Sequence, residues 1–329
     1  MVTIKKIAQE LNLSPATVSL ALNGSPLVAA KTRERVKAVA ARLDYVPNNF
    51  GRGLQSRQSR LIGYICSSVR NSFNGEVIEA AGRAAAENDY GVLIGVSGEK
   101  CEFFEQELQL FLEKHVDGIL LTMDWVFDGE KFPDFIRKVT QRNIPVILVA
   151  TDAVNCPFPV VNTDNYRGGY LACEHLAKLG HRKVCYSVDS APQHRGEGYA
   201  AAAGDYGMEI VSYPGWSAMI DGIVHDRDIT GVLCNSDYSG IDMISALRHL
   251  GFRVPADISV MGFDDVWYAA HPEFNLSTVA QQRGELGQRA MKSLLKSIKT
   301  EAELPPIQLV EPQLIVRDST GTPTQRRDR

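Results

Sequence analysis

A short helix near the start of the chain is predicted by the run Ser14-Pro15-Ala16-Thr17-Val18-Ser19-Leu20-Ala21-Leu22-Asn23. Ser14 can accept a hydrogen bond from a free backbone N–H of the first turn, and Pro15 suits the first helical position because no N–H is needed there. The apolar residues at helical spacing are Val18, Ala21 and Leu22. The segment Asn23-Gly24-Ser25-Pro26 then ends the helix.

Two more short helices are expected around this one. Thr3 can cap a first helix, and residues 32–43 predict a third. The apolar residues of the first helix are Ile4, Ile7, Ala8 and Leu11. A helix, a short turn and a second helix is the arrangement that presents the second helix to the major groove of DNA. Three short helices also occur as a plain bundle, so spacing alone leaves both interpretations open.

The charge of the chain is divided between its two parts. The first sixty residues carry ten Lys and Arg against three Asp and Glu, a net charge of +7, and the remaining residues carry a net charge of −11. Basic charge on one small module is the footprint expected of phosphate contact. A solvated basic face is the commoner outcome of a charge run, so a motif must accompany the charge.

Length and composition narrow the class of protein. A chain of 329 residues with 44% hydrophobic residues can bury a large core in two or three domains. The start lacks the apolar run of a signal peptide and no segment approaches eighteen uncharged apolar residues, so we expect a cytoplasmic protein without a membrane partner. The six cysteines are scattered without metal-ligand spacing, which predicts buried thiols and neither a metal site nor disulfides.

Five blocks in the first fifty residues resemble the DNA-binding head of the LacI (lactose repressor) family of transcriptional regulators. They are Val2-Thr3-Ile4-Lys5-Lys6-Ile7-Ala8, Ala16-Thr17-Val18-Ser19, Leu22-Asn23-Gly24, Thr32-Arg33-Glu34-Arg35-Val36 and Asp44-Tyr45-Val46-Pro47-Asn48. Their order and separations make the resemblance highly specific. It implies a helix-turn-helix head over residues 1–46.

The resemblance also implies how this head meets DNA. It implies that Thr17, Ser19 and Asn23 contact phosphates, while Pro15, Ala16 and Leu20 face base edges. The full set of expected DNA-binding residues is Thr3, Ser14, Pro15, Ala16, Thr17, Ser19, Leu20, Asn23, Asn48 and Leu54. The three base-facing positions are Pro15, Ala16 and Leu20, although the third is often Arg or His in the family. Because none of the three offers a side-chain hydrogen bond, we expect half-sites to be distinguished by thymine methyl contacts and by DNA shape.

Residues 47–59 are polar, basic and glycine-bearing, which is typical of a flexible linker. The family resemblance implies a sharper alternative, a hinge helix that forms on DNA and inserts Leu54 between base pairs in the minor groove. Gly51 and Gly53 should each disfavour such a helix by about 1 kcal/mol relative to Ala. We therefore expect that Gly51→Ala with Gly53→Ala tightens DNA binding, unless no hinge helix forms.

From Leu61 onward, short apolar segments alternate with helical ones. The predicted strands are residues 62–66, 91–95, 118–121, 145–149, 184–187, 232–234 and 259–263, and helices are predicted at 77–88, 103–114 and 166–179. This alternation predicts an α/β body with two doubly wound parallel sheets. Such sheets bind ligands at the carboxyl ends of their strands, so a small molecule between two lobes is expected.

The resemblance continues through the body and covers about residues 2–318. The matching segments are Thr163-Asp164-Asn165-Tyr166-Arg167-Gly168-Gly169, residues 175–182, Arg195 with Gly198-Tyr199, and residues 254–265. It implies a body like a periplasmic sugar-binding protein, with three crossovers between the lobes. The implied division places residues 60–161 and 282–309 in an N-terminal lobe and residues 162–281 and 310–329 in a C-terminal lobe.

Effector-binding residues follow from positions that match the family. They are Ser67, Phe73, Arg195, Trp216, Asp264, Gln281 and Arg283. Arg195 and Asp264 could grip vicinal hydroxyls, and an aromatic side chain such as Trp216 could cover a sugar ring. The plainer alternatives are a surface ion pair for Arg195, a helix cap for Asp264 and a loop aromatic covering the core for Trp216.

Three departures leave the ligand open. Ala150 stands where many sugar-binding relatives have Asp, Ser236 stands where they usually have Asn, and Arg283 stands at a position that is aromatic in the lactose repressor. A sugar remains the expected effector, while Arg195 and Arg283 could instead share the charge of a phosphorylated or acidic ligand.

No motif for a phosphate loop, a dinucleotide, a nucleophile elbow or a zinc protease occurs in the chain. We therefore expect no enzyme and no cofactor, but a homodimeric repressor of pseudo-palindromic operator DNA that a small molecule controls allosterically. The tail from Asp318 has no leucine heptads, so a tail-mediated tetramer is not expected. The alternatives are a solute-binding protein of the sugar-transport type, which would need a signal peptide, and a sugar-processing enzyme, which would need an acid/base pair.

Overall fold

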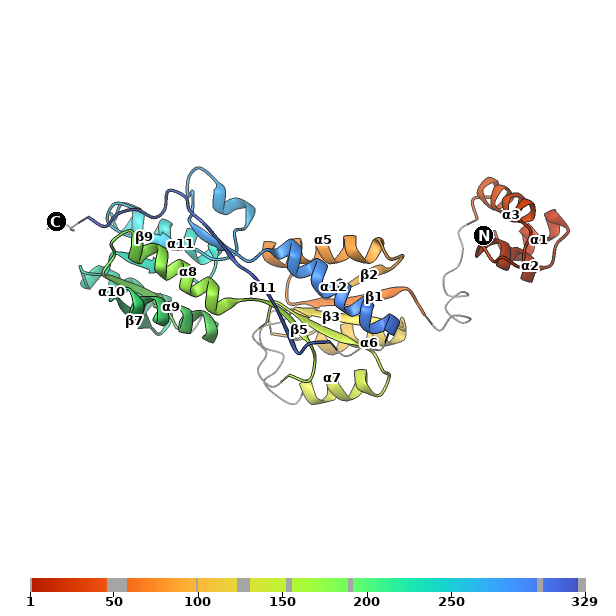
Figure 1. Ribbon diagram of the computed structural model, residues 1–329, viewed down its shortest axis with the longest axis horizontal. Helices are drawn as coiled ribbons and strands as arrows, with labels where there is room; N and C mark the ends of the chain where they lie inside the picture. Colours follow the sequence, from red (N-terminus) through yellow and green to blue (C-terminus); the bar gives the residue numbers. More distant parts are fainter. Residues whose placement is uncertain are drawn as a thin grey trace. The chain divides into compact units, whose positions relative to one another are not determined.

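The computed structural model describes residues 2–45, 58–98, 100–122, 131–151, 156–188, 192–300 and 304–324. It divides into two compact units, Met1–Ser59 and Arg60–Arg329, which Figure 1 shows with the chain coloured from red to blue. The expected DNA contacts Asn48 and Leu54 lie outside the described residues, as do the hinge glycines Gly51 and Gly53.

Three helices form the first unit, which we call the head. They are α1 (Ile4–Leu11), α2 (Pro15–Leu22) and α3 (Ala30–Arg42). The Ser14 hydroxyl accepts a hydrogen bond from the Thr17 backbone N–H at 3.0 Å and caps α2 as expected. The small core that joins the helices contains Ile7, Ala8, Val18, Ala21, Val28, Val36 and Ala40. The third helix begins two residues earlier than predicted, and Thr3 precedes α1 in extended backbone without a side-chain cap.

The first lobe of the body is a parallel sheet covered by helices on both faces. Its elements are β1 (Leu61–Cys66), α5 (Ser72–Ala86), β2 (Gly91–Val96), α6 (Phe104–Glu113), β3 (Gly118–Thr122), α7 (Lys131–Thr140), β4 (Val146–Val149), β5 (Val160–Thr163), α12 (Arg283–Thr300) and β11 (Ile307–Val310). The strand order is β11-β5-β4-β3-β1-β2. Side chains of α5 and α12 share one core with the sheet, while α6 and α7 pack on its other face.

The second lobe repeats this plan with a smaller sheet. Its elements are α8 (Asn165–Lys178), β6 (Lys183–Ser187), α9 (Gln193–Asp205), β7 (Glu209–Tyr213), α10 (Gly215–His225), β8 (Gly231–Leu233), α11 (Asp237–His249), β9 (Ser259–Met261), the 3-10 helix η1 (Trp267–Ala270), β10 (Thr278–Ala280) and β12 (Gln313–Ile315). The parallel order is β7-β6-β8-β9, and β10 pairs antiparallel with β12. Helices α8 and α9 cover one face, and α10 and α11 the other.

Three connections join the lobes within the described chain. They run from β5 to α8, from β10 to α12 and from β11 to β12, and Figure 1 shows them meeting near the middle of the body. The predicted architecture, with two doubly wound parallel sheets, is confirmed. Helix α5 begins at Ser72, five residues before the predicted start, because Asn71 caps it by accepting the Phe73 N–H at 3.0 Å. No described helix has the length and apolarity to cross a membrane.

Candidate DNA-binding surface and effector site

Helix α2 turns its expected base-reading positions toward solvent. Pro15, Ala16 and Leu20 are exposed, Leu20 to 39%, whereas Val18 and Ala21 are buried in the head core. Helical periodicity separates these two sets, because each residue advances 100° around the axis. The head therefore presents an apolar, hydroxyl-bordered helix surface, as the sequence predicts.

Two expected DNA-binding residues on this surface interact with each other. The hydroxyls of Ser14 and Thr17 lie 2.8 Å apart, and Ser14 also caps the helix. Thr3 and Asn23 are exposed, while Ser19 is half-buried. None of these five side chains is fully buried, so each is open to an approaching DNA backbone.

Arg195 lies inside the second lobe, and the alternative of a surface ion pair is wrong. Its side chain is 4% exposed, and its guanidinium carbon lies 3.4 Å from the centre of the Phe263 ring. Asn165 Oδ1 accepts from Nε and Nη2, and the carbonyl and Oδ1 of Asn235 accept from Nη1. Neither asparagine was predicted, although Asn235 directly follows a predicted strand and could have been found by the carboxyl-end rule.

Two glycines let α8 and α9 approach closely and so set the position of Arg195. A Cβ atom on Gly198 would lie 2.1 Å from the Tyr166 carbonyl oxygen, and one on Gly169 would lie 2.2 Å from the Arg195 carbonyl oxygen. Both are impossible contacts with backbone, so any larger residue would force the helices apart. The sequence pattern contains these glycines, but their role depends on the packing of two helices.

Asp264 and Gln281, both expected effector contacts, are brought together. Asp264 Oδ1 accepts a hydrogen bond from Gln281 Nε2 at 2.5 Å, and Gln281 Oε1 accepts one from the Thr163 hydroxyl at 2.8 Å. The alternative role of Asp264 as a helix cap is wrong, since Val266 occupies the cap position of η1. Asp264 and Asp265 have φ angles of 120° and 58°, so this turn holds strained backbone of the kind found at functional sites.

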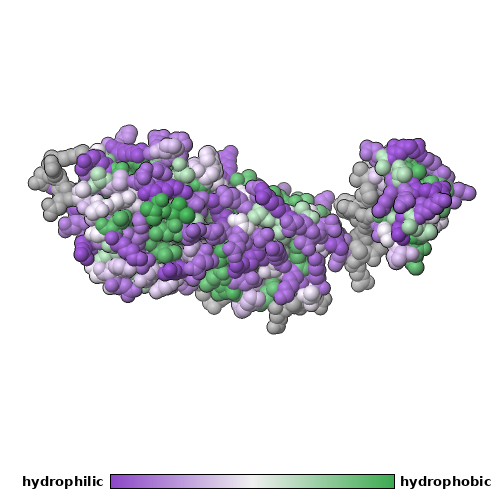
Figure 2. All heavy atoms as spheres, turned by 45° about the horizontal axis from the view of Figure 1, so that its top comes forward, coloured by the Kyte–Doolittle hydropathy of each residue, from purple (hydrophilic) through white to green (hydrophobic). Residues whose placement is uncertain are grey.

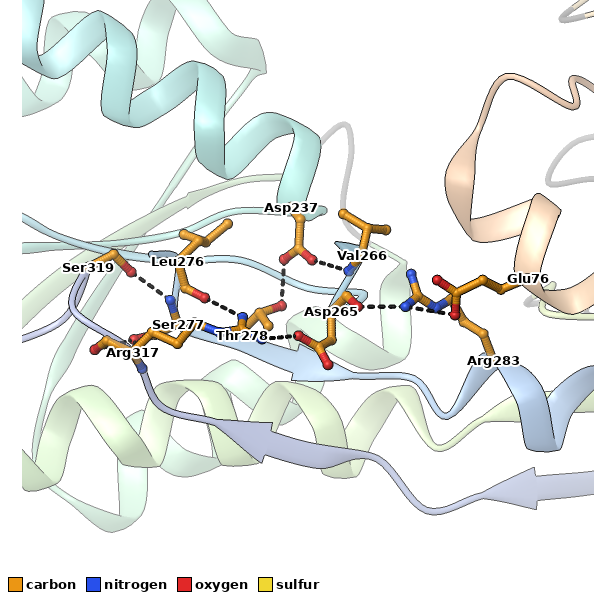
Figure 3. A network of polar contacts seen from close by, with 10 residues as sticks. All are labelled: Glu76, Asp237, Asp265, Val266, Leu276, Ser277, Thr278, Arg283, Arg317 and Ser319. Carbon is orange, nitrogen blue, oxygen red and sulfur yellow. Dashed lines mark hydrogen bonds and ion pairs between the residues drawn. The ribbon is translucent and has the colours of Figure 1, made fainter. Parts of the chain in front are cut away.

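Arg283 connects the two lobes, as Figure 3 shows. Its Nη2 donates to the Asp265 backbone carbonyl at 2.5 Å and forms an ion pair with Glu76 of α5 at 2.9 Å. Asp265 is itself paired with Arg317 at 2.5 Å. Arg283 is 8% exposed, and its Nη1 has no hydrogen-bond partner among the described residues.

Asp237 is a buried carboxylic acid that sequence reasoning did not assign to a role. It is fully buried, accepts from the Val266 N–H at 2.8 Å and receives the Thr278 hydroxyl (Figure 3). Burial and the neighbouring Asp264 raise the pKa of Asp237 to about 8. The side chain is therefore largely protonated at neutral pH.

A cavity of about 240 Å³ opens at the carboxyl ends of β6 and β8. The described residues that line it are Ser187, Gly215, Trp216, Met219, Leu233, Cys234, Asn235, Ser236 and Ser239. Trp216 lies in the first turn of α10 and is 37% exposed. Its ring therefore lines the cavity and does not serve only to cover the hydrophobic core. Ser236 caps α11 through a reciprocal bond with Ser239.

Of the seven expected effector residues, Trp216 alone lines this cavity in the described chain. Ser67 is half-buried at the end of β1, and Phe73 packs into the core of the first lobe. Arg195 lies inside the second lobe, and Asp264, Gln281 and Arg283 lie in the polar contacts around the lobe connections. Within the same described ranges, no three His, Cys, Asp or Glu side chains gather in a way that could hold a metal ion.

Comparison with known proteins identifies the relatives of this chain. Residues 3–48 match the model of bacterial regulatory proteins of the lacI family, and residues 173–320 match the periplasmic binding protein-like domain. The ribose operon repressor of Haemophilus influenzae is 30% identical over 97% of this chain and 98% of its own length. The chain belongs to the LacI family.

Solved structures of LacI-family proteins have the same fold. The lac repressor dimer bound to operator and the anti-inducer ONPF matches with a TM-score of 0.83 at 24% identity, over 97% of this chain and 99% of that one. The complex of the transcriptional regulator CelR with cellobiose matches with a TM-score of 0.69 at 26% identity, over 97% and 100%. This LacI-family chain is accordingly a transcriptional regulator with a DNA-binding head, and the predicted family and function class are confirmed.

Proposed function

We propose that this LacI-family regulator is a dimeric repressor that binds pseudo-palindromic operator DNA and is controlled by a small uncharged effector bound between its two lobes. The observation that carries the proposal is the union of a helix-turn-helix head, within a first stretch of sixty residues of net charge +7, with a two-lobed body that has a cavity at the carboxyl ends of its strands. The protein binds DNA in the cytoplasm and regulates transcription; it does not catalyse a reaction.

The lining of the cavity favours an uncharged effector. Hydroxyl and amide groups with one indole ring surround it and none of the lining side chains is charged, a composition suited to a sugar or a nucleoside-like molecule. Burial raises the pKa of the Cys234 thiol, so this residue adds no charge either. The names of two relatives mention neutral sugars: the ribose operon repressor and the complex of CelR with cellobiose.

Both arginines that suggested an acidic ligand are already engaged. Arg195 is held by Asn165 and Asn235, and Arg283 is neutralised by Glu76. A phosphate or carboxylate would have to displace these partners in a buried setting, which is costly. The donor that remains on Arg283 Nη1 suits a neutral hydroxyl or carbonyl oxygen.

Exposed apolar residues support the dimer. Ile94, Val96, Phe103 and Leu110 are 37% to 52% exposed on β2 and α6, which pack together at the free edge of the first sheet. Another mainly apolar surface is a groove between α10 and α11. Separately, Figure 2 shows a compact hydrophobic patch on the second lobe. An exposed apolar sheet edge is a liability that a second copy of the chain would cover.

The polar contacts at the lobe connections provide a path for control. Arg283 touches both lobes, and Gln281 joins Asp264 of the second lobe to Thr163 of the first. We propose that effector binding changes these contacts and the angle between the lobes, and through it the hold of the heads on DNA. We propose lobe boundaries at residues 163/164, 281/282 and 310/311, two of them slightly later than the expected 161/162 and 309/310, because β5 ends at Thr163 and β11 at Val310.

The test combines DNA selection with ligand screening on the full-length protein. Duplexes selected from a random pool should carry an inverted repeat, and their affinity should fall steeply between 50 and 200 mM salt. Thermal-shift measurements should favour neutral sugars and nucleosides over matched phosphates and sugar acids. Glu76→Gln should narrow that preference for neutral ligands, because it leaves Arg283 without its counter-charge.

Different results would contradict each part. A protein that binds a sugar but no duplex would behave as a solute-binding protein, and turnover of the ligand would indicate an enzyme. A larger shift with a sugar phosphate or sugar acid than with its neutral parent would reject the uncharged effector while leaving the DNA-binding function intact.

A further inference from the structure

The most exposed large apolar side chain in the described chain belongs to Leu27, at 83%. It follows α2, outside the motif residues that the sequence marked for DNA contact. A single exposed leucine is common on protein surfaces and needs no explanation by itself. The backbone around Leu27 is what makes it unusual.

Leu27 stands at the tip of a tight turn. The Val28 N–H donates to the Ser25 carbonyl at 3.2 Å, which closes a β-turn with Pro26 in its second position, and proline favours that position because its φ is fixed. Val28 is 6% exposed and anchors the far side of the turn in the head core.

Arg33 of α3 holds both ends of this turn. Its Nη1 donates to the Ser25 carbonyl at 3.1 Å and to the Val28 carbonyl at 2.6 Å. The Leu27 N–H also donates to the Ser25 hydroxyl at 3.3 Å. The backbone therefore holds the Leu27 side chain out in solvent. Because this backbone is already constrained, it would lose little conformational entropy on binding.

The turn adjoins the base-facing helix. The Ser25 N–H donates to the Leu20 carbonyl at 3.0 Å, so the base of the turn rests on the last turn of α2 beside the third base-facing residue. The positive charge of the first sixty residues would attract the head, and with it this end of α2, to DNA. In the major groove, the thymine methyl is the main apolar group that a side chain can contact.

We propose that Leu27 is a further specificity-determining residue, which packs on a thymine methyl group different from the one that Leu20 reads. This inference rests on the proposed function, operator binding by the head. Two leucines on a helix and a rigid turn would then read two positions of each half-site without a polar contact.

The test measures the coupling between Leu27 and single methyl groups. Each thymine of the selected operator is replaced in turn by deoxyuridine, which removes one methyl, and affinities are measured for the full-length wild type, Leu27→Ala and Leu20→Ala. At one thymine the wild type should lose roughly four-fold, the value of one buried methyl-sized group, and Leu27→Ala should lose nothing further there. Leu20→Ala should show the same behaviour at a different thymine.

Controls separate this reading from a structural role. Leu27→Ala should leave the circular dichroism and thermal unfolding of the protein unchanged, because the side chain is exposed. Leu309→Ala, at a 50% exposed leucine of β11, should leave DNA binding unchanged. Equal losses for wild type and Leu27→Ala at every thymine would overturn the inference, although operator binding would stand; a wild type that binds no duplex would overturn both.

Discussion

At the scale of single residues, the site depends on groups whose charge is decided by burial. Asp237 and Arg283 are both almost completely buried, and Arg283 is paired with Glu76 whereas Asp237 has no cationic partner among the described residues. Burial and the neighbouring acids raise the pKa of Asp237, so this side chain tends to keep its proton. Neither property can be read from residue type alone.

Asp237 should make stability depend on pH. Its pKa is about 8 in the folded protein and near 3.8 in an unfolded chain, so folding takes up a proton between these values. The stabilisation is complete below about pH 4 and is lost as pH rises to about 8, by at most roughly 1.4 kcal/mol per pH unit. Asp237→Asn should flatten this slope in urea unfolding measured from pH 4 to 8, because its amide oxygen can still accept from the Val266 N–H while its NH2 donates to the Thr278 hydroxyl and carries no titrating proton.

Identical slopes for the wild type and Asp237→Asn would show that the carboxyl group is ionised in the folded protein. Asp264 and Asp265 also raise the pKa of Asp237, so Asp264→Asn should reduce the slope by a smaller amount.

At the scale of secondary-structure elements, the close contact of α8 and α9 positions Arg195. This contact exists because Gly169 and Gly198 present no side chain where backbone meets backbone. Helix propensity alone would favour alanine at both places, so packing has overridden the local preference. The two glycines therefore lower the intrinsic stability of α8 and α9, but they allow the close helix contact that positions Arg195.

Gly198→Ala should lower the free energy of unfolding by about 1–3 kcal/mol, because the new Cβ collides with the Tyr166 carbonyl. It should also weaken effector binding, since Arg195 lies one turn earlier in the same helix. Gly204→Ala is the matched control: the same helix has open space there, and the change should leave stability equal or raise it by up to about 1 kcal/mol. Thermal unfolding and ligand thermal shifts measure both variants, and equal behaviour would refute the packing argument.

At the scale of the whole molecule, the operator binding that we propose depends on two heads held together by a dimer. The surface of β2 and α6 combines a free sheet edge with exposed Ile94, Phe103 and Leu110. Covering it would bury apolar area at about 25 cal/mol per Å². A charge placed there should therefore be costly in the dimer and harmless in the monomer.

Leu110→Asp should shift the protein toward monomer in analytical ultracentrifugation and should reduce operator affinity at least ten-fold, because two half-sites are no longer bound together. Leu309→Asp adds the same charge at the opposite edge of the sheet and should leave both properties unchanged. A Leu110→Asp protein that remains dimeric would place the interface elsewhere, with the groove of α10 and α11 as the next surface to change.

The sequence by itself determined the division of charge, the three helices of the head, the alternation of strands and helices in the body, and membership of the LacI family. These features depend on residues within a few positions of one another, or on motifs of fixed spacing, and hydrophobic periodicity is a local property. The strands β7, β10 and β12 escaped prediction because they lack a continuous apolar run of the kind that revealed the equally short β3 and β8.

The tertiary structure decided which polar groups meet. Arg195 meets Asn165 and Asn235, Arg283 meets Glu76, and Leu27 is held out by Arg33. These partners come from different helices, strands and turns, in one case about two hundred positions apart, so no periodicity relates them. The burial of a side chain likewise depends on every element that packs around it, and for Asp237 this burial raises the pKa.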